Sequence, residues 1–510
     1  MIPYLTILTL VPLFGGIVVA GLGSARRNLV RGFSLFFSLI GLAGAFCLWT
    51  HFKAANSDPQ FAELAPWIPS LGVQYHLGID GLGLLMVMLT ALVVPLSIMV
   101  SWSMADRPHV YHALILWLQA GLFGTFTALN FIHWFMFWEL ALIPAFFLVK
   151  LWGGPNRGPA ATQFFVYTMV GSVALLLSFL ALYLATHSFE FITLRDMAKA
   201  GTLTTQLQAA FGWRNIGLLV FFGAFLGFAV KVPLVPFHTW LPSVYAEAPS
   251  PVTMLLTGVM SKMGVYGFLR VLLPIFPDQL RQVLTPLLWL AVATIVLSAC
   301  AAFAQRDLKR MLAYSSVNHL GYCLLAMFAA VGAAAGVHQP ELQKAAALDG
   351  VLLQMFNHGL TASALFLFVA LIEKRSSGLR GLDDFGGIRQ VVPVFAGLMG
   401  IALFSSLGLP GLNGFVGEFL LFKGTFPLAP WAAALSTIGL LVTAIFLLTL
   451  IQRVFCGPLN PRWALLPDLS TAERFLVLPS IALMFLLGIW PQFILGTIDA
   501  TVMKLVQQIS

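Results

Sequence analysis

The sequence predicts an all-α polytopic membrane protein with about fourteen transmembrane helices. Of its 510 residues, 59% are hydrophobic and only 9% are charged, with a mean hydropathy of +0.93. Soluble domains carry about 25% charged residues. Apolar runs of about 20 residues, long enough to cross some 30 Å of hydrocarbon, recur along the whole chain. These runs leave no room for a soluble domain between them.

The predicted spans follow one another from the first residues to the last. The first apolar run begins at Ile2 without a basic segment or a small-residue cleavage site, so we expect a retained helix rather than a signal peptide. The expected span centres are near residues 12, 40, 90, 121, 140, 174, 224, 262, 293, 321, 360, 408, 442 and 485.

Proline interrupts two of these spans. Pro233 and Pro236 follow Lys231, and Pro410 interrupts the span at 404–422. Proline removes a helix donor and leaves backbone carbonyls free inside the membrane. It also kinks membrane helices that have no transport role, but here each break has a charged residue nearby. Paired broken helices are typical of transporter sites near the membrane midplane.

The two breaks also predict an internal repeat. Pro233 and Pro410 lie 177 residues apart, and this offset pairs predicted helices five to eight with ten to thirteen. Each unit has five helices, an odd number, so the two copies insert with opposite orientation. The expected division is 1–110 for helices one to three, 111–278 for the first inverted repeat (helices four to eight), 279–456 for the second (helices nine to thirteen) and 457–510 for helix fourteen.

Four charged residues lie near the middle of apolar stretches: Glu139, Lys231, Lys262 and Glu418. A charge at bilayer depth costs roughly 2.5–3.5 kcal/mol on the insertion scale, so such groups usually face a bundle interior or a hydrated path. Together with the breaks, they predict an ion or proton route. Glu139 and Lys231 are a candidate pair. The alternative is a buried salt bridge kept for packing specificity, although such pairs rarely add net stability.

Lys262 lies too deep to reach either surface easily, so we expect polar neighbours around it. The polar residues of the tenth and eleventh spans lie largely on one face of each helix: Ser315, Ser316 and His319, and Gln354, His358 and Thr361. Histidine exchanges protons near neutral pH, and hydroxyl groups with trapped water extend a relay. Each histidine equally fits a hydrogen bond between two helices.

Charge and cysteine content exclude several other functions. Outside the spans, sixteen Lys and Arg follow odd-numbered helices and nine follow even-numbered ones, which predicts both termini on the outer side of a cell inner membrane. Because these charges are split among short loops, we expect no nucleic-acid partner. The four scattered cysteines indicate neither a disulfide framework nor an iron–sulfur cluster. No G-x-x-x-x-G-K-[ST] occurs, so energy has to come from an ion gradient or a partner.

Three further charged residues are expected at span ends. Asp80 is expected to cap or anchor the third span, and Glu247 to be a surface carboxylate in a loop. Lys423 follows Glu418 by five residues, which places the two on different faces of a regular helix, so Lys423 is expected to reach the outer interface.

Several runs closely resemble the antiporter-like subunits of proton-pumping NADH:quinone oxidoreductase, respiratory complex I. They are FMFWELALIPAFFLVKLWGG, FAVKVPLVPFHTWLPSVYAEAPSPVTMLLTGVMSKMGVYGFLR, AQRDLKRMLAYSSVNHLGY and LGLPGLNGFVGEFLLF. The resemblance covers residues 78–458. Within that family the chain looks most like the subunit M branch, the relatives of mitochondrial subunit 4, because the broken twelfth helix carries Glu418 where related subunits carry lysine.

The resemblance implies a proton-translocating subunit without redox chemistry of its own. It implies that Glu139 modulates its partner, that Lys231 lies at the break, and that Lys262 is the central lysine. Glu418 is then the exit-side carboxylate, and His319 and His358 lie along a central hydrophilic axis. No cofactor is expected in this chain. Flavin, iron–sulfur clusters and quinone are expected in partner subunits, and adjacent antiporter-like subunits are the expected neighbours.

Three departures from the family pattern leave alternatives open. Asn130 stands where many relatives have an acidic residue. The segment EAPSPVTMLLTGVMSK differs from the usual family sequence before the central lysine, and Lys423 is an added charge. The alternative function is a subunit of a multisubunit sodium/proton antiporter or a membrane-bound hydrogenase. An inert scaffold between other subunits is a second alternative. A quinone- or haem-binding enzyme is a third, although the ten histidines show no convincing pair of axial ligands.

Overall fold

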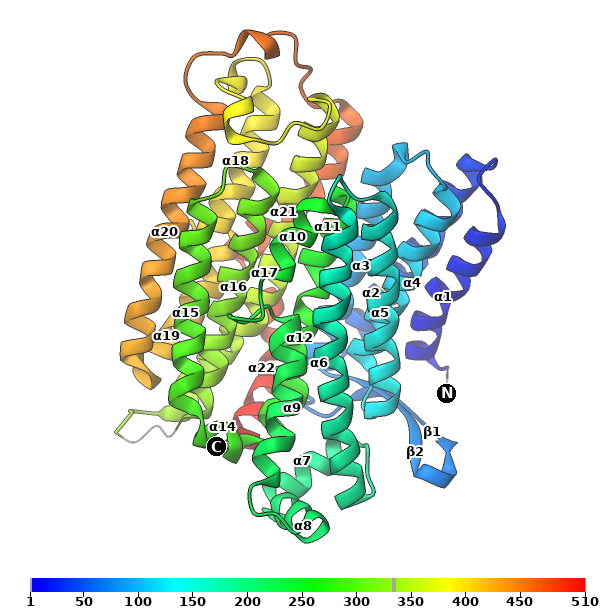
Figure 1. Ribbon diagram of the computed structural model, residues 1–510, viewed down its shortest axis with the longest axis vertical. Coiled ribbons are helices and arrows are strands. Elements are labelled where there is room, and N and C mark those ends of the chain that lie inside the picture. Colours follow the sequence, from blue (N-terminus) through cyan, green and yellow to red (C-terminus); the bar gives the residue numbers. More distant parts are fainter. Residues whose placement is uncertain (1, 333–335, 510) are drawn as a thin grey trace.

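The computed structural model describes residues 2–332 and 336–509. Its long helices run roughly along one direction, and the two chain termini lie toward the same end of the bundle (Figure 1). That placement agrees with an even number of membrane crossings. Which side of the membrane this end faces stays a prediction.

The first part of the chain contains two peripheral helices, a hairpin and a buried helix. Their bounds are α1 (Tyr4–Gly21), α2 (Arg27–His51), β1 (Gln60–Ile68), β2 (Val73–Ile79) and α3 (Gly81–Val100). Strands β1 and β2 pair antiparallel. This hairpin was not predicted, because its two strands are short amphipathic segments without the apolar length of a span.

The middle of the chain contains the first broken helix. Its elements are α4 (Pro108–Thr127), α5 (Phe131–Trp152), α6 (Arg157–Thr186), α7 (Phe191–Lys199), α8 (Thr202–Phe211), α9 (Ile216–Lys231) and α10 (Trp240–Glu247). Helix α9 ends at Lys231 and helical structure resumes at Trp240, which confirms the predicted break. Two backbone donors inside the break find partners: the amide of Leu234 donates to the carbonyl of Ala229, and that of Val235 donates to Thr294 Oγ1.

The next span alternates α-helix and π-helix. It comprises α11 (Ser250–Leu255), the π-segment η3 (Leu256–Met260), α12 (Lys262–Gly267), the π-segment η4 (Phe268–Leu272) and α13 (Leu273–Ile275). A single π-turn is rare and often marks a functional site. Here the two π-segments flank the turn that begins with Lys262.

The remaining elements contain the second broken helix. They are α14 (Pro277–Gln282), α15 (Leu284–Phe303), α16 (Leu308–Val331), α17 (Pro340–Arg375), α18 (Pro393–Leu407), α19 (Asn413–Leu428), α20 (Pro430–Phe455), α21 (Thr471–Ile489) and α22 (Gln492–Ile509). The gap between α18 and α19 confirms the predicted break around Pro410. Thirteen predicted span centres fall in helices, and the fourteenth, at residue 408, falls in this gap.

Helix length and apolar composition determine how many of the described helices can cross a membrane. Eleven described helices are long and apolar enough to cross a membrane, and counting the bent pair of α8 and α9 raises this number to twelve. Fourteen crossings, the division at 1–110, 111–278, 279–456 and 457–510, and the inverted relation of the two units therefore stay predictions.

Burial separates a central set of helices from a peripheral set. All of the most apolar window of the span Ser250–Ile275 is buried, and so is 94% of that of α17, against 28% in α2 and α21. The span that carries Lys262 and the helix that carries His358 are thus shielded from lipid. The apolar outer faces of the peripheral helices suit lipid or other subunits.

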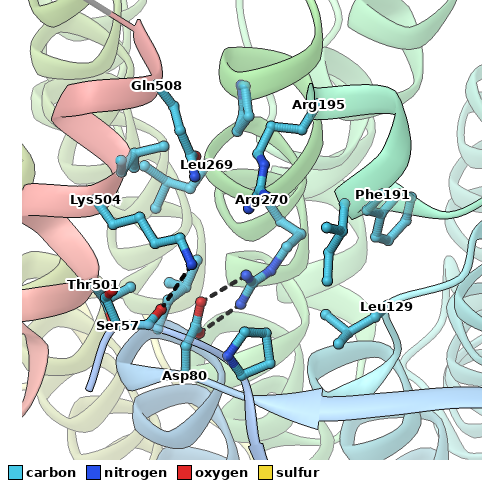
Figure 2. Close-up of a pocket in the computed structure, with 15 residues that line it drawn as sticks. Ser57, Asp80, Leu129, Phe191, Arg195, Leu269, Arg270, Thr501, Lys504 and Gln508 are labelled. Carbon is cyan, nitrogen blue, oxygen red and sulfur yellow. Dashed lines mark hydrogen bonds and ion pairs between the residues drawn. The ribbon is translucent and has the colours of Figure 1, made fainter. Parts of the chain in front are cut away.

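A buried ion pair joins two distant segments beside α22 (Figure 2). Asp80 caps α3 by accepting from the amide of Gly83, as expected, and both of its oxygens lie 2.6 Å from Arg270 on η4. The first residue of α3 is also held to α22, because Thr501 Oγ1 accepts from the amide of Gly81. Arg270 is one of the nine basic residues that were assigned above to loops after even-numbered helices. The structure places it in this internal pair instead.

We predict that Asp80→Asn lowers the free energy of unfolding by about 3 kcal/mol, because it leaves the Arg270 guanidinium mostly buried without a counter-charge. The matched control is Asp58→Asn. Asp58 is exposed, and the hydrogen bond and charge of Lys504 lower its pKa. Removing an exposed pair costs about 0–1 kcal/mol. Thermal unfolding of the detergent-solubilised protein measures both changes, and equal stability losses would contradict the clamp role of Asp80.

Candidate proton-relay site

Four of the six predicted site residues form one buried row across four helices. The Nζ of Lys262 lies 2.8 Å from His358 Nδ1, and His319 Nδ1 lies 3.0 Å from Glu418 Oε1. The two imidazole rings face each other with centroids 5.0 Å apart. Lys262 is fully buried, and the other three are at most 7% exposed. The row therefore runs from a central lysine to a carboxylate at the second break.

The backbone around Lys262 aims its ammonium at His358. The ammonium donates to the carbonyl of Thr257, five residues earlier, at 2.5 Å. Thr257 lies in η3, where the amide of Ser261 also bonds five residues back, to the carbonyl of Leu256. Three polar partners surround the ammonium, since Ser261 Oγ lies 3.4 Å away. A buried charge is tolerated when it is hydrogen-bonded in this way.

His319 connects the row to its carboxylate end. Its Nδ1 faces both Glu418 and the amide group of Gln354, and its Nε2 lies 3.2 Å from Ser406 Oγ. Each ring nitrogen thus has a polar partner. Imidazole accepts a proton on one nitrogen and releases one from the other, so this arrangement suits proton transfer.

The second helix break makes room for Glu418. Gly408 closes α18 with a φ of +80°, a conformation that glycine adopts readily. A Cβ on Gly408 would lie 2.8 Å from Glu418 Oε2. The start of α19 is fixed by a reciprocal contact in which the side chains of Asn357 and Asn413 each donate to the other's backbone carbonyl. The break therefore positions a carboxylate that a continuous helix would crowd.

Lys231 sits apart from this row. Its side chain is 3% exposed at the end of α9, and its Nζ lies 4.5 Å from the centroid of the Trp138 ring. Among the residues that the structure describes, no carboxylate lies within 4.0 Å of it. A cation over an indole face is stabilised by about 2 kcal/mol when desolvated. Its close neighbour is thus an aromatic ring rather than an acid.

The expected direct pair of Glu139 and Lys231 is not formed. Glu139 is half-buried on α5 and shares a face with Met136 and Ile143, which are 48% and 49% exposed. Its Oε1 is buried and has no hydrogen-bond partner within residues 2–332 and 336–509. The adjacent Trp138 takes the position over the ammonium. Glu139 and Lys231 therefore make no direct ion pair.

The helices that carry the two lysines touch through their backbones. A Cβ on Gly264 of α12 would lie 2.8 Å from the amide nitrogen of Val232 and 3.1 Å from the carbonyl carbon of Lys231. Only a residue without a side chain permits this approach. The helix of Lys262 therefore packs directly against the end of the helix that carries Lys231.

Sequence reasoning misjudged several polar residues. Glu247 is 6% exposed and accepts from the amide of Asn156, so the expected surface carboxylate is wrong. Lys309, counted above as an orientation charge in a loop, is 2% exposed on α16. Its spacing of seven residues from Ser316 places both on one face of a helix, which was a usable signal. Lys423 is exposed, as expected.

Within the described ranges, no cluster of three or more His, Cys, Asp or Glu side chains could hold a metal ion. The four cysteines are all free thiols: Cys47, Cys300, Cys323 and Cys456.

Comparison with known proteins places the chain among membrane subunits of respiratory complexes. The family model described as NADH:quinone oxidoreductase/Mrp antiporter, TM matches residues 128–445. The chain is 35% identical to NADH-quinone oxidoreductase subunit M of Rhodobacter capsulatus, covering 99% of this chain and 96% of that protein. It is 34% identical to F(420)H(2) dehydrogenase subunit M of Methanosarcina mazei, with coverages of 97% and 96%.

Solved structures show the same fold. A chain of respiratory complex I from Thermus thermophilus with bound NADH superposes with a TM-score of 0.84 at 27% identity, covering 99% of this chain and 100% of that one. A chain of the Mrp complex from a Dietzia species reaches a TM-score of 0.82 at 20% identity, with complete coverage of both chains. The second match is a likeness of fold alone.

We predict that Gly408→Ala lowers stability by about 1–2 kcal/mol, because it forces a side chain into the left-handed region beside Glu418. Gly400→Ala, on the same helix α18, is the control. A Cβ there meets nothing within 4 Å, and alanine stabilises a helix interior by about 0.5–1 kcal/mol. Thermal unfolding compares the two, and opposite signs are expected. A stabilising Gly408→Ala would contradict this account of the break.

Proposed function

The chain belongs to the NADH:quinone oxidoreductase/Mrp antiporter transmembrane family, and from that premise we propose that it is the antiporter-like, proton-translocating subunit M of an NADH:quinone oxidoreductase. The observation that carries the proposal is the buried row of Lys262, His358, His319 and Glu418. Each member both takes up and releases a proton, and the row ends at a broken helix.

The proposed proton transfer follows the contacts between these four residues. The Lys262 ammonium gives its proton to His358 Nδ1, which lies 2.8 Å away. His358 passes a proton to His319 by rotation of a ring or through water, since the ring centroids are 5.0 Å apart. His319 then protonates Glu418 at 3.0 Å. Each step moves one proton and leaves the preceding group ready to take up the next.

Charge coupling gives the row a direction. Two unit charges 10 Å apart in a medium of effective dielectric constant 20 interact by about 1.7 kcal/mol, more than a tenfold change in proton affinity. Lys231 lies on a helix in backbone contact with the one that carries Lys262. A charge that approaches Glu139 from a neighbouring subunit shifts the charge state of Lys231 and, through it, that of Lys262.

We place the redox chemistry in partner subunits. Flavin, iron–sulfur clusters and quinone belong there, and this chain receives their energy as an electrostatic or conformational signal. The proposed partners are the other membrane subunits, above all adjacent antiporter-like subunits. The chain is a multi-pass membrane protein. We propose that it lies in the cell inner membrane with both termini on the outer side, as the distribution of basic residues favours.

The second candidate function is a subunit of a sodium/proton antiporter. The fold of the Mrp chain keeps this candidate open. Glu418 favours the first candidate, because related subunits carry lysine at this position of the broken helix. Co-purification separates the two: a flavin and iron–sulfur arm accompanies the chain under the first function and is missing under the second.

We predict that Lys262→Met, in the assembled complex reconstituted into vesicles, lowers the protons moved per electron pair, with transfer through this chain slowed about tenfold or more. Lys262→Arg is expected to do the same, because arginine keeps the charge but does not release its proton. Lys423→Met removes an exposed charge and is expected to change nothing. Full proton yield in an intact Lys262→Met complex would leave the scaffold alternative standing.

A further inference from the structure

In the proposed relay each group after Lys262 lies next to the following one. The proton that reloads Lys262 needs a source. A cavity of about 570 Å³ opens where α3 and α17 end and α11 begins, at the end of the bundle away from the chain termini. Ser250 and Glu373 line it, together with Arg31, Lys374 and Glu473 from other elements. Water enters a charged cavity of this size, so it reaches Glu373.

The inner wall of this cavity holds a partly buried ion pair. Ser250 Oγ donates to Glu373 Oε2 at 2.5 Å, and Lys309 Nζ lies 3.8 Å from Glu373 Oε1. The Glu373 side chain is 21% exposed, whereas that of Lys309 is 2% exposed and donates to the carbonyl of Ala248. The carboxylate thus faces water and the ammonium faces the protein. Burying such a pair seldom adds stability, which points to a functional role.

Other charged groups surround the pair without replacing it. Arg380 Nε lies 2.6 Å from Asp307 and its NH1 3.7 Å from Glu373 Oε1. Arg380 is therefore held chiefly by Asp307, and Lys309 is the cation on the protein side of Glu373.

Two helical faces lead from this pair toward Lys262, one with a row of hydroxyl groups and one with a single hydroxyl. Ser250, Thr253 and Thr257 are spaced three and four residues apart along the first face, and Ser316 lies seven residues after Lys309 on α16. Both faces advance about 10.5 Å over these residues. They meet where Thr257 Oγ1 and Ser316 Oγ lie 2.9 Å apart. The carbonyl of Thr257 is the one that binds the Lys262 ammonium.

One further hydroxyl lies beside this meeting point without a partner. Tyr245 is 1% exposed, and its hydroxyl has no hydrogen-bond partner in the described part of the chain, although the hydroxyls of Thr257 and Ser261 lie near it. A buried hydroxyl left unpaired costs about 1–3 kcal/mol, so such groups usually bind ordered water. Tyr245 therefore offers an open hydrogen-bonding hydroxyl beside Thr257 and Ser261.

We propose that Glu373, held by Lys309, is the proton-loading site of this chain, and that Thr253, Thr257, Ser316 and Tyr245 carry the proton inward to Lys262. Glu373 takes a proton from cavity water. Each hydroxyl accepts one proton and gives up another, and the last transfer restores the ammonium of Lys262 after it has protonated His358. Lys309 keeps its charge and serves as a positioning residue. This inference rests on the proposed function and adds the side from which the protons come.

The test uses the assembled complex in vesicles, with Lys262→Met as the reference. We expect Glu373→Gln to slow proton transfer through this chain about tenfold and Glu373→Asp to retain most of it. Glu341→Gln removes an exposed carboxylate from the same helix α17 and is the matched control. A reduced yield in Lys262→Met beside a full yield in Glu373→Gln would overturn the loading site and leave the proposed function intact. A full yield in Lys262→Met would instead overturn the proposed function itself.

Two further experiments keep the proposal decidable if Glu373→Gln fails to assemble. Thr257→Val and Ser316→Ala remove the touching hydroxyls with little change of volume, and a full proton yield in both would overturn the path. In Glu373→Cys, iodoacetate adds a carboxylate through the cavity and iodoacetamide adds a neutral amide. Recovery with iodoacetate alone is expected. Equal recovery with both reagents would show that no acid is needed there. No recovery with either reagent in an assembled complex would also overturn the loading site.

Discussion

The contact between the Lys262 ammonium and His358 organises the buried centre of this protein. Two basic groups 2.8 Å apart in a buried site cannot both be charged at low cost. In the proposed relay, one proton passes between them when a nearby charge changes. The π-segments aim the ammonium, and the tenth and eleventh spans supply the rings.

The helix breaks and glycines serve the same constraint. Gly264 lets the helix of Lys262 touch the end of the helix of Lys231, and Gly408 leaves space for the carboxylate of Glu418. The most deeply buried helices include those of Lys262 and His358, and the peripheral helices α2 and α21 present apolar surface. Charge is thus concentrated along one axis, where neighbouring groups alter one another's proton affinity and lipid does not reach.

Local sequence patterns predicted the breaks and four residues that the fold brings into one buried row, because proline, glycine and a charge within an apolar run have few tolerated environments. They did not predict which groups touch. Trp138, next to Glu139 in the chain, takes the position over Lys231 that the acid was expected to fill. Lys309 resembled an ordinary loop charge until packing buried it. Side-chain facing depends on tertiary packing, which no spacing rule contains, and the inverted repeat stays a prediction for the same reason.

In the proposed relay a proton, rather than only a charge, passes from Lys262 through His358. Proton yield per electron pair in complex carrying His358→Asn tests it most directly, since asparagine still hydrogen-bonds to the lysine but takes up no proton. This account predicts that the yield falls by the full contribution of this chain while the complex stays assembled. An undiminished yield would contradict it.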